Sequence, residues 1–418
     1  MKHLDTSFFF LKNQIQEYPW GSHTWIHDLL EGIEHLDSSK PAAELWMGMH
    51  PKAPSLAMTG AGLVPLGDLI QSNPDYFIGA SIAKSYGTLP FLFKILAAEK
   101  PLSIQAHPNL IQAQEGFTRE NQAGIPLSAD NRNYKDPNHK PEIICALTPF
   151  TAMCGFRPIQ EIVYLFSVFE FAVLQSCLEA LSIPNQETAY RNFLQQLFAL
   201  TAEQRHTLYQ GLQKQLPLVK MQHPSASIEW DLVSSFMKLF PEDPTVLAPL
   251  YLNVMTLHPG QAIFLPAGIL HAYVHGLGVE LMANSDNVLR GGLTNKYIDT
   301  EELLRILRFE PYRPEISNGA TDCSEQSVSY RCYPCPVPEF QLFSLHVSSE
   351  HPSQIPREPG KPSILIITEG KAQIHRSSGV TSLEKGQSMF IPACATPLEI
   401  SGTCTLYGAT TGTLEARL

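Results

Sequence analysis

His271 follows a segment whose glycine and proline spacing is typical of a turn that leads into a strand. Pro266 comes six residues after Gly260, Gly268 two residues later, and His271 three residues after that. Glycine and proline turn the chain, and a histidine at the start of the next strand offers a ring nitrogen to a metal ion. A histidine in this position alone is usually structural, so the interpretation depends on other ligand-type residues elsewhere in the chain.

A second candidate segment is Ser103-Ile104-Gln105-Ala106-His107. Alternate side chains of a strand share a face, so Ser103, Gln105 and His107 are expected on the same side. Burying a glutamine beside a histidine costs free energy unless a partner satisfies both, and a metal ion would do so. The alternative is a polar strand face that is satisfied by hydrogen bonds alone.

Glu142 brings a carboxylate into an otherwise apolar stretch, Ile143 to Leu147. A carboxylate there is either paired or a metal ligand, and the alternative is a surface ion pair with Lys140. With Gln105, His107 and His271 it makes a set of two nitrogen and two oxygen donors. Zinc accepts histidine nitrogen and carboxylate oxygen, and a single carboxylate leaves a net charge of about +1, which favours Lewis-acid chemistry.

The composition describes an ordered protein with a large core. The chain has 418 residues, of which 44% are hydrophobic and 17% charged, so we expect two or three domains. A net charge of −11 argues against a nucleic-acid partner, and an anionic small molecule would need a local basic pocket.

We expect a cytoplasmic protein that does not enter a membrane. Lys2 and Asp5 flank no long apolar stretch, and the apolar block 162–174 is too short to span a bilayer. Eight cysteines are scattered along the chain, as in a protein that stays reduced. We interpret the motif at Cys332 and Cys335 as incidental thiols rather than a metal site.

The pattern along the chain changes twice. Short strands, turns and short helices predominate at first, helical periodicity follows, and strands return from about residue 250, with a helix near Thr300–Arg308. Thr201 and Gln204 predict a capping box at a helix start. The other predicted elements are helices at Pro65–Asn73, Asn73–Gly79, Ile159–Leu181, Gln186–Leu200 and Ile228–Leu239, strands at Leu92–Leu96 and Leu102–His107, a linker or wrapped loop at Pro311–Glu339, and short strands within Ser363–Ala409.

An internal repeat links two distant segments. Residues 260–267 and 386–393 are identical at five of eight positions, beginning with Gly-Gln in both. Continuing the same register places Pro397 where His271 stands. The repeat predicts two similar β-structures, of which only the first has the histidine.

The spacing around His271 resembles the second signature box of the cupin family, and longer blocks are similar to type I phosphomannose (mannose-6-phosphate) isomerases, a zinc-dependent cupin family. This resemblance covers nearly the whole chain and is least in the C-terminal part. The blocks that carry it are 18–21, 43–48, 89–94, Leu102–Pro108, Tyr134–Glu142 and Asn284–Lys296.

The resemblance implies a mainly β fold with two cupin-like (jelly-roll) β-barrels and an inserted α-helical domain. We expect a catalytic barrel at 1–157 and 246–310, a helical insertion at 158–245, and a C-terminal barrel without metal ligands at 311–418. It also implies one Zn²⁺ per chain, with Gln105, His107, Glu142 and His271 as ligands.

The family interconverts mannose 6-phosphate and fructose 6-phosphate by moving a proton between C2 and C1 through a cis-enediol. Such a reaction needs a base, a group that stabilises oxygen charge, and a phosphate site. Lys140 or His139 is the candidate base, with Asp286 and Arg290 as partners, and the sequence does not choose between them. Arg290 either stabilises enediolate charge, assists ring opening, or pins a loop as a structural residue.

The resemblance assigns the phosphate to Ser103, Lys94, Arg157 and Lys296, of which Lys296 and Arg157 are alternatively solvated surface charges. Trp20 and Tyr273 either line the sugar or belong to the core.

Two rival functions fit a metal-binding cupin. An iron oxygenase would use the two histidines and Glu142, with Gln105 outside the ligand set. A sugar-binding protein with an inert metal would not need Lys140, Asp286 and Arg290. We expect a phosphosugar as the partner and a monomer as the oligomeric state, while a catabolic role and a biosynthetic role in GDP-mannose supply both stay open.

Overall fold

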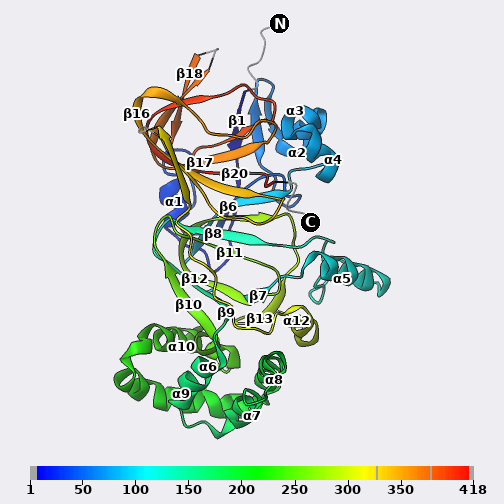
Figure 1. Cartoon of the computed structure of the whole chain (residues 1–418), viewed down its shortest axis with the longest axis vertical. Helices are drawn as coiled ribbons and strands as arrows, with labels where there is room; N and C mark the ends of the chain where they lie inside the picture. Colours follow the sequence, from blue (N-terminus) through cyan, green and yellow to red (C-terminus); the bar gives the residue numbers. More distant parts are fainter. Residues whose placement is uncertain (1–6, 326–327, 377–378, 414–418) are drawn as a thin grey trace.

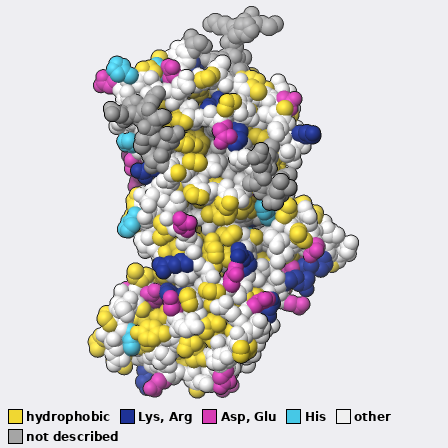
Figure 2. Space-filling view, in the orientation of Figure 1, with side chains coloured by type: hydrophobic (Ala, Val, Ile, Leu, Met, Phe, Trp, Pro, Cys, Tyr) yellow, Lys and Arg dark blue, Asp and Glu magenta, His cyan; other side chains and the backbone are white. Residues whose placement is uncertain are grey.

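The computed structural model describes residues 7–325, 328–376 and 379–413 and is mainly β (Figure 1). Lys2 and Asp5, on which the prediction about the N-terminus depends, lie outside the described residues. In this part of the chain, no helix is long and apolar enough to cross a membrane. On the face shown in Figure 2, acidic and basic side chains are interspersed.

The strands of the described part form two ten-stranded sheets. The first sheet contains the strands that carry the predicted ligands, and β12 at its centre pairs with four neighbours, β6, β7, β8 and β9. Its strands are β2 (Gln14–Gln16), β3 (Glu44–Met47), β6 (Phe91–Ala98), β7 (Ile104–Ala106), β8 (Glu142–Ala146), β9 (Phe150–Phe156), β10 (Leu252–Leu257), β11 (Ala262–Leu265), β12 (His271–Ala283) and β13 (Leu289–Gly292).

The second sheet combines strands from both ends of the chain. Three N-terminal strands join it through the antiparallel pair β1–β19. Its strands are β1 (Phe9–Lys12), β4 (Leu56–Thr59), β5 (Gly62–Pro65), β14 (Ala320–Glu325), β15 (Val328–Cys332), β16 (Gln341–Gln354), β17 (Ser363–Arg376), β18 (Gly379–Glu384), β19 (Ser388–Ile391) and β20 (Glu399–Thr410).

Two predictions about this sheet are wrong. The segment Pro311–Glu339 is more than a loop, because it contains the hairpin β14–β15. Its Pro, Ser and Cys content hid an alternation in which Val328 and Tyr330 pack on the core while Ser329 and Arg331 alternate with them. Within Ser363–Ala409 the strands are also not all short, since β17 has 14 residues and β20 has 12, whereas β18 and β19 are short as predicted.

Helices gather at one end of the molecule, below the first sheet in Figure 1. The predicted capping box is confirmed: the Thr201 hydroxyl accepts from the Gln204 backbone N–H, and the Gln204 side chain accepts from Thr201 N–H. These helices are α6 (Ile159–Ser167), α7 (Gln175–Ala180), α8 (Gln186–Phe198), α9 (Ala202–Gln222), α10 (Ser227–Leu239) and α11 (Ala248–Tyr251), with 3₁₀ turns at Ala172–Leu174, Pro224–Ala226 and Pro244–Leu247.

The single helix predicted over Ile159–Leu181 is wrong, because the chain breaks between α6 and α7. The break lets Phe169 pack edge-on against Trp230 of α10 and stack on Phe171. Burial of these rings outweighs the free energy of continuing a helix whose propensity is only a weak preference. The remaining helices are α1 (Trp25–Leu29), α2 (Leu66–Ser72), α3 (Pro74–Ile78), α4 (Ala80–Tyr86), α5 (Leu110–Gln122) and α12 (Thr300–Ile306).

The internal repeat is visible in the backbone. Gly260 and Gly386 both have positive φ, 83° and 87°, which favours glycine. The Gln261 side chain accepts from the His258 N–H at 2.9 Å, and the Gln387 side chain accepts from the Glu384 N–H at 2.8 Å. The strands β11 and β19 then occupy matching positions in the two copies. The copies diverge afterwards, because β12 begins at His271 whereas β20 begins two residues beyond Pro397.

Candidate active site

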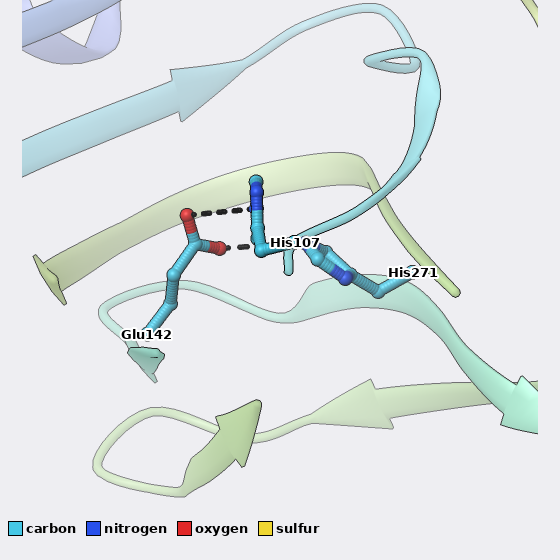
Figure 3. A group of neighbouring side chains, drawn as sticks. All are labelled: His107, Glu142 and His271. Carbon is cyan, nitrogen blue, oxygen red and sulfur yellow. Dashed lines mark ion pairs between the residues drawn. The ribbon is translucent and has the colours of Figure 1, made fainter. Parts of the chain in front are cut away.

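Two strands of the first sheet, β8 and β12, and the residue that directly follows β7 bring Glu142, His271 and His107 together (Figure 3). One potential ligand atom from each lies within 4.8 Å of the others, and all three residues are buried. The Glu142 Oε1 lies 3.3 Å from His107 Nε2, and its Oε2 lies 3.4 Å from His271 Nε2. His271 therefore meets two residues that lie more than 100 positions earlier in the sequence.

The hydrogen bonds of the two histidines orient them as metal ligands. His107 Nδ1 lies 2.7 Å from the Asn287 carbonyl oxygen, and His271 Nδ1 lies 3.0 Å from that of Ile269. Because a carbonyl only accepts, each Nδ1 carries the proton and each Nε2 directs a lone pair toward Glu142. Lone pairs facing a carboxylate repel unless a cation lies between them.

The polar atoms of the cluster also fit a cation. The His107 Nε2 and Glu142 Oε2 are buried and make no hydrogen bond among the described residues. Burial, helped by Lys140, lowers the pKa of His107 to about 4, so the ring is neutral at pH 7 and available to a metal. The donor set therefore suits zinc.

Gln105 lies beside this cluster. Its residue is paired with His271 across β7 and β12, so the two side chains share a face. The Gln105 Nε2 lies 3.4 Å from His271 Nε2. Rotating the amide by 180° exchanges its nitrogen and oxygen, so the oxygen then faces the cluster.

Lys140 lies against the cluster. Its Nζ is 2.8 Å from Glu142 Oε1, and both side chains are buried, so the pair is not the surface ion pair considered from the sequence. Burial alone would raise the pKa of Glu142, but Lys140 and His107 hold it well below its ordinary value. Glu142 is therefore a full carboxylate at neutral pH.

Arg290 extends the row of side chains by one strand. It is paired with Gln105 across β13 and β7, so His271, Gln105 and Arg290 follow one another on a common face. The residue is half-buried, and burial lowers its pKa from the ordinary value. In the described part of the chain no hydrogen bond or ion pair to its guanidinium is found, so this group is free to bind an oxyanion.

Asp286 and His139 point toward other partners. Lys52 Nζ lies 2.7 Å from Asp286 Oδ2, and His50 Nε2 lies 3.5 Å from Oδ1. Burial would raise the pKa of Asp286, but His50 and Lys52 hold it well below the ordinary range, which makes it a poor base. His139 Nε2 lies 3.2 Å from Glu339 Oε1 of the C-terminal region.

Lys94 is buried between two carboxylates. Its Nζ lies 2.9 Å from Glu280 Oε2 and 3.4 Å from Glu44 Oε1, and the Trp46 indole donates to Glu44 at 2.8 Å. Burial would lower the pKa of Lys94, but Glu280 and Glu44 outweigh it and raise the pKa. A contact to phosphate would require this ammonium to leave both partners.

The other predicted substrate residues are dispersed. Arg157 Nε donates to the Leu252 carbonyl at 2.9 Å, and its Nη2 lies 2.6 Å from Glu229 Oε1. The side chain therefore joins the sheet to α10. Lys296 is exposed, and Ser103 is half-buried directly before β7. Tyr273 is fully buried in an apolar cluster, and Trp20 packs against the same cluster. The structure thus brings Ser103 to the strand that carries Gln105, but ties Arg157 to the helices.

The sequence interpretation missed several residues around the cluster. Glu44 and Glu280 each interrupt an apolar strand, which is the signal that identified Glu142. Asn287 is fully buried and binds the backbone beside Lys135. Nothing in the local sequence marks His50 and Lys52, since their role depends on Asp286 more than 230 residues later.

Comparisons with known proteins agree with this geometry. Residues 8–159 match the family model described as phosphomannose isomerase type I, catalytic domain. The chain is 41% identical over 402 residues to the mannose-6-phosphate isomerase of Escherichia coli (strain K12), covering 94% of this chain and 96% of that protein. It is 32% identical over 405 residues to the human mannose-6-phosphate isomerase, covering 92% and 93%.

Solved structures show the same similarity. A zinc-bound mannose 6-phosphate isomerase superposes with a TM-score of 0.86 at 37% identity, covering 98% of this chain and 100% of that chain. A mutant of the phosphomannose isomerase from Salmonella typhimurium superposes with a TM-score of 0.87 at 37% identity, covering 97% and 99%.

Proposed function

The chain belongs to the type I phosphomannose isomerase family, and from this premise we propose how its residues interconvert mannose 6-phosphate and fructose 6-phosphate. It is an aldose–ketose isomerase with one zinc ion per chain, which we assign to Gln105, His107, Glu142 and His271. When bound, zinc supplies Lewis-acid polarisation of sugar oxygens. The observation that carries the assignment is the buried pair of Nε2 lone pairs directed at one carboxylate.

Lys140 is the proton-transfer group in this proposal. Its ammonium lies at the edge of the ligand set, whereas His139 faces Glu339 and Asp286 is held ionised by two cations. In its neutral form the Lys140 amine accepts the proton from C2 of the open-chain aldose and returns it to C1, while the proton of the O2 hydroxyl passes to O1. The same face of the enediol is used for both transfers, as a cis-enediol requires.

Arg290 stabilises the negative charge that develops on the enediol oxygens. A guanidinium without a carboxylate partner among the described residues keeps its donors available. Asp286 then serves as an ionised carboxylate that holds Lys52 and His50 in place. Its low pKa supports this role over that of a base.

We keep Ser103 and Lys296 as phosphate ligands, because neither is committed to a carboxylate. Lys94 we assign to positioning rather than direct contact, since Glu44 and Glu280 already neutralise it. Arg157 would have to leave Glu229 to reach the substrate, so its part in phosphate binding stays a prediction. Trp20 and Tyr273 fit a role in closing the apolar floor below the sugar.

The two sheets support a fold of two jelly-roll barrels. We propose a catalytic barrel from 1–157 and 246–310, a helical insertion at 158–245, and a second barrel at 311–418 that also takes in the N-terminal strands β1, β4 and β5. The matching Gly-Gln turns support a duplicated barrel. A monomeric enzyme is part of the same proposal, as is a cytoplasmic location, which the free thiols of the described cysteines support.

A coupled assay for fructose 6-phosphate formed from mannose 6-phosphate tests the function. We expect turnover that a chelator abolishes and added zinc restores. Full turnover in metal-free protein would refute the metal assignment. Oxygen consumption by the iron-loaded protein, with no fructose 6-phosphate formed, would instead favour the oxygenase alternative.

A further inference from the structure

A carboxylate just before the second sheet's strand β16 contacts the loop that carries His139 and Lys140. Glu339 directly precedes Phe340 and β16, and its residue is 8% exposed. Its Oε1 lies 3.2 Å from Nε2 of His139, 200 positions earlier in the sequence. A buried carboxylate placed on a histidine from a different part of the fold needs a reason, because burying it costs free energy.

His139 lies between the two anchored parts of its loop. On one side, the Asn138 carbonyl accepts from Asn287 Nδ2 at 2.9 Å and from Ser285 Oγ at 3.1 Å. On the other side, Lys140 contacts Glu142. His139 and Lys140 are consecutive residues of this loop, so a contact that holds His139 also restricts where Lys140 lies beside the metal cluster.

The support for Glu339 is rigid. Phe340 is fully buried and packs against Phe264 of β11 with ring centroids 6.4 Å apart. Phe264 is paired with Ile143 of β8, the residue after Glu142. The Tyr333 hydroxyl also donates to the Gly260 carbonyl at 3.1 Å. The segment that carries Glu339 is therefore fixed to the same strand pair that carries the ligand carboxylate.

We propose that Glu339 is a positioning residue that acts through His139 to aim Lys140 at the reacting carbons. This inference rests on the proposed role of Lys140. It gives the C-terminal part of the chain a role in turnover. A displacement of about 1 Å at a proton-transfer group costs on the order of 100-fold in rate, so a modest shift of the loop is measurable.

A double-mutant cycle on the zinc-loaded enzyme tests the inference. The variants are Glu339→Gln, His139→Gln and the pair together, with Glu384→Gln as the matched control, because Glu384 pairs with Lys371 on an exposed hairpin of the same sheet. We expect each single variant to lower kcat by about 10-fold or more, with KM changed less than about twofold. Zinc content is expected to stay at the wild-type value.

The pair of substitutions decides between positioning and simple stabilisation. If Glu339 acts through His139, the double variant has the kcat of the single variants, because the second change removes nothing further. Three results would overturn the inference. The first is a double variant whose fold-loss in kcat is the product of the two single losses. The others are an unchanged kcat in Glu339→Gln, and a loss of kcat that parallels a loss of zinc content. His139→Gln tests the contact from the other side should Glu339→Gln not fold.

The control variant and the wild type distinguish a failure of the proposed isomerase function from a failure of the positioning role of Glu339. Glu384→Gln is expected to keep wild-type kcat, and an equal loss there would also overturn the inference. An inactive, zinc-loaded wild type would overturn the proposed function and this inference with it. An active wild type with an unaffected Glu339→Gln variant overturns this inference alone.

Discussion

Replacing Asn287 by alanine should weaken both the fold and the metal centre. Asn287 is fully buried, and its backbone carbonyl accepts from Nδ1 of the ligand His107. Its side chain donates to the carbonyls of Asp136 at 2.7 Å and Asn138 at 2.9 Å. The side-chain oxygen accepts from the backbone N–H of Lys135 at 2.7 Å and of Asp136 at 3.2 Å.

The size of the effect follows from those contacts. A hydrogen bond contributes about 1 kcal/mol, and leaving a buried backbone group without a partner costs about that much or more, so Asn287→Ala should lower the free energy of unfolding by about 4 kcal/mol. Alanine retains the carbonyl that His107 binds, but without the side-chain anchors this carbonyl shifts. Disturbing such a partner of a ligand histidine weakens metal affinity by about 10- to 100-fold.

Two measurements and one control variant check the predicted losses of stability and zinc affinity in Asn287→Ala. Urea unfolding of the zinc-free proteins gives the stability change, and competition with a chelator gives the zinc affinity. Asn253→Ala is the control, because Asn253 is also buried and its Nδ2 donates to backbone carbonyls, including that of Tyr312 at 2.8 Å. It should lose stability while zinc affinity changes less than about twofold. Unchanged zinc affinity in Asn287→Ala would refute the argument that this side chain positions His107.

Three further predictions concern the charges around the cluster. His271→Ala should lose zinc, whereas Arg290→Ala should bind zinc fully and lose about 100-fold or more in kcat, as metal analysis and the coupled assay would show; normal turnover in Arg290→Ala would remove it from the mechanism. Lys94→Met should lower the free energy of unfolding by about 3–5 kcal/mol because it leaves two carboxylates buried together, while Glu44→Gln should cost much less; equal losses in urea unfolding would contradict this. The pKa of His107 in the folded zinc-free chain is about 4, below the unfolded value of about 6.5, so the unfolded state binds the extra proton between these values. The free energy of unfolding should therefore fall as pH falls from about 6.5 toward 4, by up to about 1.4 kcal/mol per pH unit, and His107→Gln should remove that part of the slope; parallel pH profiles for the two proteins would be the contrary result.

Local patterns in the sequence predicted the elements that depend on neighbouring residues. The capping box at Thr201 formed as expected because both of its hydrogen bonds lie within one helical turn. The repeated Gly-Gln turn formed twice with the same side-chain contact. The ligand types were recognisable because His107 and Glu142 are polar residues in stretches that are otherwise buried, and burial of such groups demands a partner.

Contacts between distant parts of the chain came only from the tertiary structure. Strand register decides that Arg290 stands opposite Gln105, and a shift of one residue would turn it to the other face. Packing of the second sheet on the first decides that His139 meets Glu339, and the pairing of β12 with β6 decides that Lys94 meets Glu280. Residue types state which groups are able to pair, but the choice of partner depends on which strands lie side by side, and that is settled by burial summed over the whole core.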